Sequence, residues 1–223
     1  MQTIFDLTGK VSVITGSTKG IGRAMAVEMA RNGATVIISS RKADACENVA
    51  AEINEELKDQ VGGAIPIPAN ISSKESTENL IHKVQTEVGR IDVLICNAAV
   101  NPSYGSMSQL EDSAFRKILD VNIMSNHWLS QLVIPDMKTK NDGVIIIVSS
   151  IGGLRGHENL GAYCISKAAD LQLVRNLALE LGPFNIRVNA VSPGLVKTDF
   201  ARALWEDPEV LEKRTRFDPL RRI

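Results

Sequence analysis

The sequence predicts an α/β domain in which helices cover both faces of a parallel sheet, an arrangement called doubly wound. Short runs rich in β-branched residues alternate with longer helical stretches along the chain. The run Val144–Val148 has no polar alternation, as expected for a strand covered on both faces. With 223 residues, of which 44% are hydrophobic, the chain can build one large core. We therefore expect a single domain over residues 1–223.

The predicted strands and helices alternate in chain order. Strands are expected at Val11–Thr15, Thr35–Ser39, Ala64–Ala69, Val93–Cys96, Val144–Ser149 and Val188–Val191. Helices are expected at Ile21–Asn32, Ala43–Leu57, Ser73–Val88, Ser113–Thr139 and Gly161–Leu181. Ser72 and Glu75 have the spacing of a capping box at the start of the third helix. Gly33, Gly89 and Gly182 stand where helices should end.

Charge and cysteine content narrow the class of partner. The 25 basic residues nearly cancel the 26 acidic ones, leaving a formal net charge of -1, so we expect no binding to nucleic acid or to an anionic membrane. No apolar run reaches the roughly 18 residues of a membrane span, and the first residues resemble neither a signal nor a transit peptide. Cys46, Cys96 and Cys164 lack the spacing of a disulfide framework or a zinc site. We expect no metal and a reducing, cytoplasmic location.

A glycine-rich turn lies directly between the first predicted strand and the first predicted helix. Glycines let the backbone turn tightly and approach a pyrophosphate, while free amides and the positive end of the helix dipole stabilise the anion. Glycine-rich turns are also common between elements, so the loop alone leaves a purely structural role open. Its position after the first strand favours dinucleotide binding. The candidate residues are Gly16, Ser17, Thr18, Lys19, Gly20, Ile21 and Gly22.

The end of the second strand indicates which dinucleotide would bind. In NAD-binding folds an acidic residue about 20 positions beyond the loop receives the adenosine ribose 2′-hydroxyl, but this sequence has Ser40, Arg41 and Lys42 there. A guanidinium can instead make a forked, charge-assisted contact with a 2′-phosphate. Arg41 alone is equally consistent with a solvated surface charge, but Lys19 and Ser40 would cluster with it. We expect NADP(H) to be preferred over NAD(H).

A tyrosine and a lysine four residues apart form the candidate catalytic pair. On a helix, Tyr163 and Lys167 lie on one face. A tyrosine ordinarily titrates near pH ~10, so a nearby ammonium is needed to stabilise its phenolate near neutrality. Ser150 follows the fifth strand, where a hydroxyl can hold a substrate oxygen in line for hydride transfer. An accidental pair on the helix and a plain strand-ending turn are the alternatives.

Taken together, these motifs resemble those of the short-chain dehydrogenase/reductase family. They follow the family's order and spacing over about residues 7–200 and comprise Thr15–Gly22, Asn97-Ala98-Ala99, Asn122, Ser150, Tyr163 with Lys167, and Pro193-Gly194. Within the family, the residues after the second strand and the stretches Asn97–Pro102 and Gly194–Trp205 resemble the NADP-dependent retinal/carbonyl reductase branch. The resemblance implies a Rossmann-type sheet with strand order 3-2-1-4-5-6.

The resemblance also implies a role for each matching residue. Tyr163 would be the acid/base, Ser150 would orient the substrate oxygen, and Lys167 would lower the tyrosine pKa and hold the nicotinamide ribose. Asn122 would anchor a water that relays protons to solvent. Asn70 stands where relatives often carry an aspartate, and its amide can both donate and accept hydrogen bonds. The further implied cofactor contacts are Asn70, Ile71, Asn97, Ala98, Ala99, Pro193, Gly194, Val196 and Thr198.

Relatives in this family continue beyond the position of Ile223 through another helix and a final edge strand. We therefore expect either that this chain is truncated or that its C-terminal part lies outside the given residues; the C-terminal edge strand is missing here, which leaves the sixth strand with an unpaired edge. The predicted helix Ala162–Leu181 is apolar around much of its circumference, which favours packing on two sides. We expect a homodimer or a homotetramer.

The sequence therefore predicts an NADP(H)-dependent oxidoreductase that transfers hydride between the nicotinamide and a carbonyl or secondary alcohol. A substrate-binding loop is expected at about residues 194–217. There Ala201, Leu204, Trp205 and Phe217 favour a hydrophobic small-molecule ketone or aldehyde. The alternative is a non-catalytic NADP(H)-binding sensor or scaffold, or an inactive truncated form.

Replacing Arg41 by Asp tests the coenzyme assignment. The variant loses a charge-assisted contact and gains a repulsion, so its preference for NADPH over NADH should fall by about 2 kcal/mol or more. The measurement is the ratio of the two coenzyme dissociation constants, obtained by fluorescence titration. Lys58→Asp makes the same change of charge elsewhere and should leave the ratio unchanged. An unaltered ratio in Arg41→Asp would show that Arg41 does not recognise the 2′-phosphate.

Overall fold

The six predicted strands form one parallel sheet. The computed structural model describes residues 4–216 and 218–223. Its strands are β1 (Val11–Thr15), β2 (Thr35–Ser39), β3 (Gly63–Pro66), β4 (Val93–Cys96), β5 (Gly143–Val148) and β6 (Ile186–Val191). Their order in the sheet is β3-β2-β1-β4-β5-β6, and every neighbouring pair runs parallel. The predicted fold class and strand order are confirmed.

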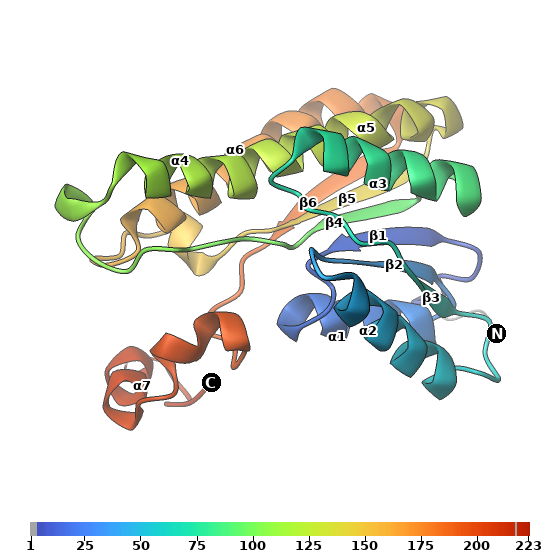
Figure 1. Cartoon of the computed structure of the whole chain (residues 1–223). Coiled ribbons are helices and arrows are strands. Elements are labelled where there is room, and N and C mark those ends of the chain that lie inside the picture. Colours follow the sequence, from blue (N-terminus) through green and yellow to red (C-terminus); the bar gives the residue numbers. More distant parts are fainter. Residues whose placement is uncertain (1–3, 217) are drawn as a thin grey trace.

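Helices cover both faces of the sheet, as Figure 1 shows. On one face lie α1 (Gly20–Arg31) and α2 (Ala43–Glu56). On the other lie α3 (Lys74–Glu87), α4 (Asp112–Leu119), α5 (Ser125–Lys140) and α6 (Gly161–Leu181). A last helix, α7 (Pro208–Thr215), stands apart from both layers together with the segment that follows β6. Short 3-10 turns occupy Met107–Gln109, Ile151–Gly153, Gly182–Phe184 and Asp199–Leu204.

The core has two halves because successive side chains of a strand point to opposite faces of the sheet. Val13 and Leu94 are buried in the half beneath α3, α5 and α6. Their neighbours Ile14 and Ile95 are buried in the half beneath α1 and α2. All four are at most 2% exposed, so the central strands are apolar on both faces. This explains why the sequence of β4 is a continuous apolar run.

Two local predictions are wrong in detail. The long helix expected at Ser113–Thr139 is interrupted by a π-helical turn, Asp120–Met124, which separates α4 from α5. The start of α3 is capped by Ser73, whose hydroxyl accepts a hydrogen bond from the Ser76 N–H, and not by a capping box beginning at Ser72. Ser72 instead donates its own N–H to Asn70 Oδ1 at 3.3 Å. The competing turn at Asn70 therefore moves the cap by one residue.

The far edge of the sheet is open in the described part of the chain. Within residues 4–216 and 218–223, β6 pairs with β5 alone, so its outer edge has no strand partner. In β6 the exposed residues Arg187 and Asn189 alternate with buried ones, and Val191 at the end of the strand is 49% exposed. No helix among the described residues is long and apolar enough to cross a membrane.

Substituting Leu94 by Ala tests how much the central strand contributes to stability. Leu94 is fully buried in the core half beneath α3, α5 and α6, so the substitution leaves a cavity and should lower the free energy of unfolding by about 2–5 kcal/mol. Chemical denaturation monitored by circular dichroism measures the loss. Leu220 is 71% exposed, and Leu220→Ala should change stability by less than about 0.5 kcal/mol. Equal effects of the two substitutions would contradict this core.

Candidate active site

The glycine loop has a backbone that only glycine can form easily. It connects β1 to α1, and Gly16 and Gly20 have φ values of +66° and +52°, which disfavour any residue with a Cβ. A Cβ on Gly22 would lie 2.4 Å from the Gly16 carbonyl oxygen and 2.5 Å from Asn97 Nδ2. The backbone at Gly22 therefore packs directly against the backbone at Gly16. The start of α1 lies at the carboxyl edge of the sheet. This is a cradle in which backbone amides can receive a pyrophosphate.

Two side chains hold the loop against neighbouring strands. The buried Ser17 hydroxyl accepts a hydrogen bond of 2.8 Å from the Ser39 N–H at the end of β2. From the end of β4, Asn97 Nδ2 donates to the carbonyls of Thr15 (2.9 Å) and Gly16 (3.3 Å). The N–H groups of Asn97 and Ala98 both donate to Thr15 Oγ1. Ser17, Asn97 and Ala98 thus fix the shape of the cradle, and Ala99 continues the same half-buried turn.

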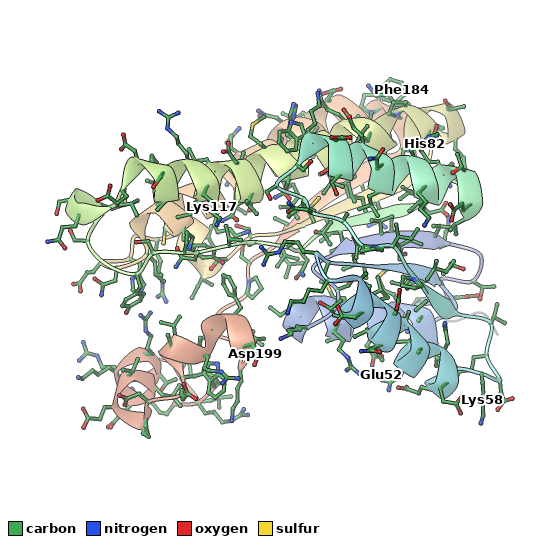
Figure 2. The ribbon with its side chains drawn as sticks, viewed as in Figure 1. Glu52, Lys58, His82, Lys117, Phe184 and Asp199 are labelled. Carbon is green, nitrogen blue, oxygen red and sulfur yellow. The ribbon has the colours of Figure 1, made fainter. Side chains whose placement is uncertain are left out.

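Positive charge gathers at the end of β2. Arg41 and Lys42 are exposed, and neither has an ion-pair partner among the residues described. Ser40 Oγ lies 3.4 Å from Cys46 Sγ. Lys19 pairs with Asp199 at 3.4 Å between Nζ and Oδ2, a partner that sequence reasoning missed because 180 residues separate the two. Asp199, labelled in Figure 2, lies on the segment beyond β6.

Asn70 and Ile71 follow β3 at the same edge of the sheet. Asn70 is exposed, and its Oδ1 accepts a hydrogen bond of 2.6 Å from the Ser72 hydroxyl. Its backbone N–H donates to Ser76 Oγ at 2.9 Å, whereas Ile71 is buried. The turn is therefore held by its own side chains, and the Nδ2 of Asn70 has no partner within residues 4–216 and 218–223.

Ser150 and Tyr163 come together where β5 ends and α6 begins. Ser150 Oγ accepts a hydrogen bond of 3.0 Å from the Gly152 N–H. The preceding Ser149 donates its hydroxyl to the Lys167 carbonyl at 2.7 Å, which ties the end of the strand to the helix. Burial raises the pKa of Tyr163 to about 12, against a hydrogen bond with Ser150 that lowers it. The phenol and the serine hydroxyl are therefore within mutual reach, as the sequence predicts.

The ammonium of Lys167 lies beneath the tyrosine ring. It is 5.8 Å from the centroid of the Tyr163 ring, and the side chain is only 2% exposed. Lys167 Nζ donates to the Val148 carbonyl at 2.8 Å and to Asp170 Oδ2 at 2.9 Å. Sequence reasoning missed Asp170, although its i,i+3 spacing from Lys167 is a visible signal. The lowered pKa that we expected for Tyr163 is replaced in this structure by a raised one, because burial outweighs the hydrogen bond with Ser150.

Asn122 lies in the π-helical turn and is fully buried. Its Oδ1 accepts from the Val100 N–H at 2.8 Å, and its Nδ2 donates to the Val100 carbonyl and to Ser166 Oγ. Its backbone carbonyl accepts a short hydrogen bond of 2.6 Å from Asn126 Nδ2. Asn122 therefore joins the loop after β4 to α6, next to the candidate catalytic pair. A role in relaying protons through water stays a prediction.

The segment after β6 lies across the loop and the tyrosine. Pro193 accepts a hydrogen bond from the Ile151 N–H at 3.1 Å, while Gly194 and Val196 are exposed. Thr198 contacts the glycine loop, since its Cγ2 lies 3.0 Å from the position of a Cβ on Gly20. Phe200, which sequence reasoning did not single out, has its ring centroid 6.1 Å from that of Tyr163. Phe217, assigned to this loop from the sequence, lies outside the described residues.

Contacts of Arg214 connect α7 to the loops that precede α4 and α6. Arg214 donates to the Tyr104 hydroxyl at 3.1 Å and lies 2.5 Å from His157 Nε2. Burial and the charge of Arg214 lower the pKa of His157, so its ring is neutral near pH 7 and can accept this hydrogen bond. The helix itself is capped by Asp207, whose Oδ1 accepts hydrogen bonds from the N–H groups of Glu209 and Val210.

The sheet order and the glycine loop between β1 and α1 are those of a dinucleotide-binding fold. The family model for short chain dehydrogenases matches residues 10–209. The chain belongs to this family, and its recognition from sequence motifs is confirmed.

Curated relatives and solved structures agree with this family. The chain is 41% identical over 202 residues to "Dehydrogenase/reductase SDR family member 4" of Bos taurus, covering 91% of this chain and 71% of the relative. It is 37% identical over 217 residues to the Homo sapiens protein of that name, covering 97% and 77%. The narrower resemblance to the retinal/carbonyl reductase branch fits relatives of this kind.

Two solved structures illustrate the shared fold. A putative NAD(P)-dependent gluconate 5-dehydrogenase from Beutenbergia cavernae with bound NADP superposes with a TM-score of 0.91 at 32% identity, covering 99% of this chain and 86% of that one. A 7α-hydroxysteroid dehydrogenase in complex with NADH and 7-oxo glycochenodeoxycholic acid gives a TM-score of 0.89 at 33% identity, covering 98% and 83%.

Substituting Gly22 by Ala tests the close packing of the loop. The new Cβ would collide with the Gly16 carbonyl and Asn97 Nδ2, so the variant should lose about 1–3 kcal/mol of stability, as for an overpacked site. Thermal unfolding measures this loss. Gly182→Ala is the matched control, because a Cβ there meets nothing within 4 Å and its φ of -53° suits alanine. A harmless Gly22→Ala would contradict the geometry of the cradle.

Proposed function

We propose that this chain is an NADP(H)-dependent carbonyl reductase or alcohol dehydrogenase with Tyr163 as acid/base. The observation that carries the proposal is the arrangement of three groups at the carboxyl edge of the sheet. A phenol, a serine hydroxyl within its reach, and a lysine ammonium 5.8 Å from its ring lie at the end of β5 and the start of α6. Beside them, the glycine loop forms a cradle that a single Cβ would fill.

The chain's own residues suit the binding of a dinucleotide. Backbone amides at the start of α1 would receive the pyrophosphate, and Arg41 and Lys42 offer cations at the end of β2, whereas Lys19 of the glycine loop is paired with Asp199. No carboxylate stands at this strand end to accept a 2′-hydroxyl. These features support NADP(H) over NAD(H). When bound, the nicotinamide would supply or accept the hydride.

The chain's residues then account for the proton and the orientation of the substrate. Tyr163, with a pKa of about 12, is protonated throughout the neutral range and would donate its proton to a carbonyl oxygen. Ser150 would donate a hydrogen bond to the same oxygen. Lys167 uses two of its three N–H donors on Val148 and Asp170, which leaves one donor for a ribose hydroxyl. A protonated acid at neutral pH favours reduction.

The substrate and the assembly follow from the surfaces around this edge. Phe200 packs toward Tyr163, and Leu204 and Trp205 continue the same partly apolar segment, so a hydrophobic carbonyl compound fits best. On α6, Ile165 is 45% and Leu179 is 82% exposed, which supports a homodimer or homotetramer. The buried free cysteines fit a reducing compartment such as the cytoplasm.

Tyr163→Phe tests the proposed chemistry. Removing the phenolic oxygen should lower turnover of carbonyl substrates with NADPH by about 10²-fold to 10⁴-fold. Coenzyme affinity should change little, because the cradle is untouched. The measurement is NADPH consumption over a panel of ketones and aldehydes, beside a binding titration with NADPH and NADH. Tyr104→Phe alters the one other tyrosine of the chain and should keep full turnover.

The same experiment separates the enzyme from a sensor or scaffold. A wild-type protein that binds NADPH but consumes none with any member of the panel would favour the non-catalytic alternative. Full turnover in Tyr163→Phe would exclude Tyr163 as the acid/base. Among these outcomes, turnover by the wild type together with loss in Tyr163→Phe supports the proposal.

A further inference from the structure

A carboxylate lies fully buried behind the candidate catalytic pair. Asp170 of α6 is 0% exposed, and Asn126 of α5 and Lys167 of α6 are 1% and 2% exposed. Burial raises the pKa of Asp170, against the ammonium of Lys167 and the amide of Asn126. A buried charge without partners is strongly unfavourable, so a carboxylate at this depth needs each of these contacts.

The contacts of Asp170 form a continuous chain from α5 to the lysine. Asn126 Nδ2 donates to the Asn122 carbonyl at 2.6 Å and to Asp170 Oδ1 at 2.9 Å. Asp170 Oδ2 then accepts from Lys167 Nζ at 2.9 Å. Each of the two carboxylate oxygens therefore has one donor, and the carboxylate is held from both sides. Asn122, which precedes Asn126 by one helical turn, is thereby linked to Lys167.

This chain of contacts changes what the ammonium does for the tyrosine. An isolated ammonium would favour the phenolate of Tyr163, but a carboxylate in contact with that ammonium opposes its field. The electrostatic effect of Asp170 on Tyr163 is unfavourable to the phenolate. Lys167 donates one hydrogen bond to this carboxylate and one to the Val148 carbonyl, so two of its three donors are used by groups other than the phenol.

We propose that Asp170, held by Asn126, is a positioning residue that fixes where Lys167 places its ammonium and how much positive charge reaches Tyr163. The inference rests on the proposed function, in which Tyr163 is the acid/base. Asp170 keeps the phenol protonated over a wide pH range and so suits it to donating a proton.

Among the described residues, two thiols are the other ionisable groups that interact electrostatically with this cluster. At the end of β4, the pKa of Cys96 is raised by Asp170 and lowered by Lys167. Cys164 of α6 raises the pKa of Tyr163. Burial raises the pKa of both thiols, so both are neutral near pH 7. At neutral pH the charge near the phenol is therefore set by Lys167 and Asp170.

Asp170→Asn in a Tyr104→Phe background gives the direct test. Tyr163 is then the one tyrosine of the chain, and its ionisation can be followed by NMR of a ¹³C-labelled phenol ring in coenzyme-free protein. Removing the negative charge should lower the pKa of Tyr163 from about 12 by about one unit or more. An unshifted titration in folded Asp170→Asn would overturn the proposal, because a purely structural aspartate would not move it.

An exchange of the two side chains guards against a variant that fails to fold. The double substitution Asn126→Asp with Asp170→Asn keeps the net charge and one amide-to-carboxylate hydrogen bond of the cluster, but removes the carboxylate from contact with Lys167. Its Tyr163 pKa should fall by less than in Asp170→Asn and still lie below that of the parent. A parent-like titration in the folded exchange variant would likewise overturn the proposal.

Activity of the unsubstituted protein keeps the two proposals separate. If the wild type turns over carbonyl substrates but neither variant shifts the titration of Tyr163, the role of Asp170 fails and the function stands. If the wild type has no turnover, the function fails whatever the titration shows. Where both proposals hold, the pH at which the rate of alcohol oxidation reaches half its maximum should be lower in Asp170→Asn than in the wild type. The decrease should be similar to that of the Tyr163 pKa, since oxidation needs the phenolate.

Discussion

Parallel pairing of the strands brings the ends of β1, β4 and β5 to one edge of the sheet, and the rest of the site depends on this constraint. In register, Ile14 lies beside Ile95 and Cys96 beside Ile147. Each strand therefore ends beside its neighbour, and the polar residues that follow must satisfy one another there. Asn97 and Ser149 do so with backbone groups of the adjacent element. The cradle and the candidate catalytic pair are consequences of these ties.

Close approach of backbone to backbone makes the cradle and the strand ends depend on each other. Gly22 can pass the Gly16 carbonyl only without a side chain, and the space so freed is taken by the Asn97 amide, which donates to that same carbonyl. Thr15 completes the set because its hydroxyl accepts from two successive N–H groups of the turn after β4. A rigid loop of this kind presents its amides without further ordering, which is the condition for tight anion binding.

The buried charges behind the candidate catalytic pair balance one another. One buried ammonium faces one buried carboxylate, and the carboxylate is shared with an amide from the neighbouring helix. The low dielectric of this region makes each contact stronger than at the surface and makes any unpaired group correspondingly unfavourable. Burial raises the pKa of Tyr163 to about 12, so the phenol is neutral near pH 7. The π-helical turn contributes by bringing Asn122 and Asn126 to the same buried region.

The sequence by itself determined the alternation of strands and helices, because buried parallel strands must be apolar and tight turns must contain glycine; the bounds of β1, β2, β4 and α6 agree with it residue for residue. It also identified Ser150, Tyr163 and Lys167 as candidates through their spacing. Only the tertiary structure decided which groups surround them. Asp199 reaches Lys19 across most of the chain, and Asp170, which has the spacing of an ordinary surface ion pair, is buried because α5 covers it. Burial and long-range contact depend on packing, which local sequence pattern does not encode.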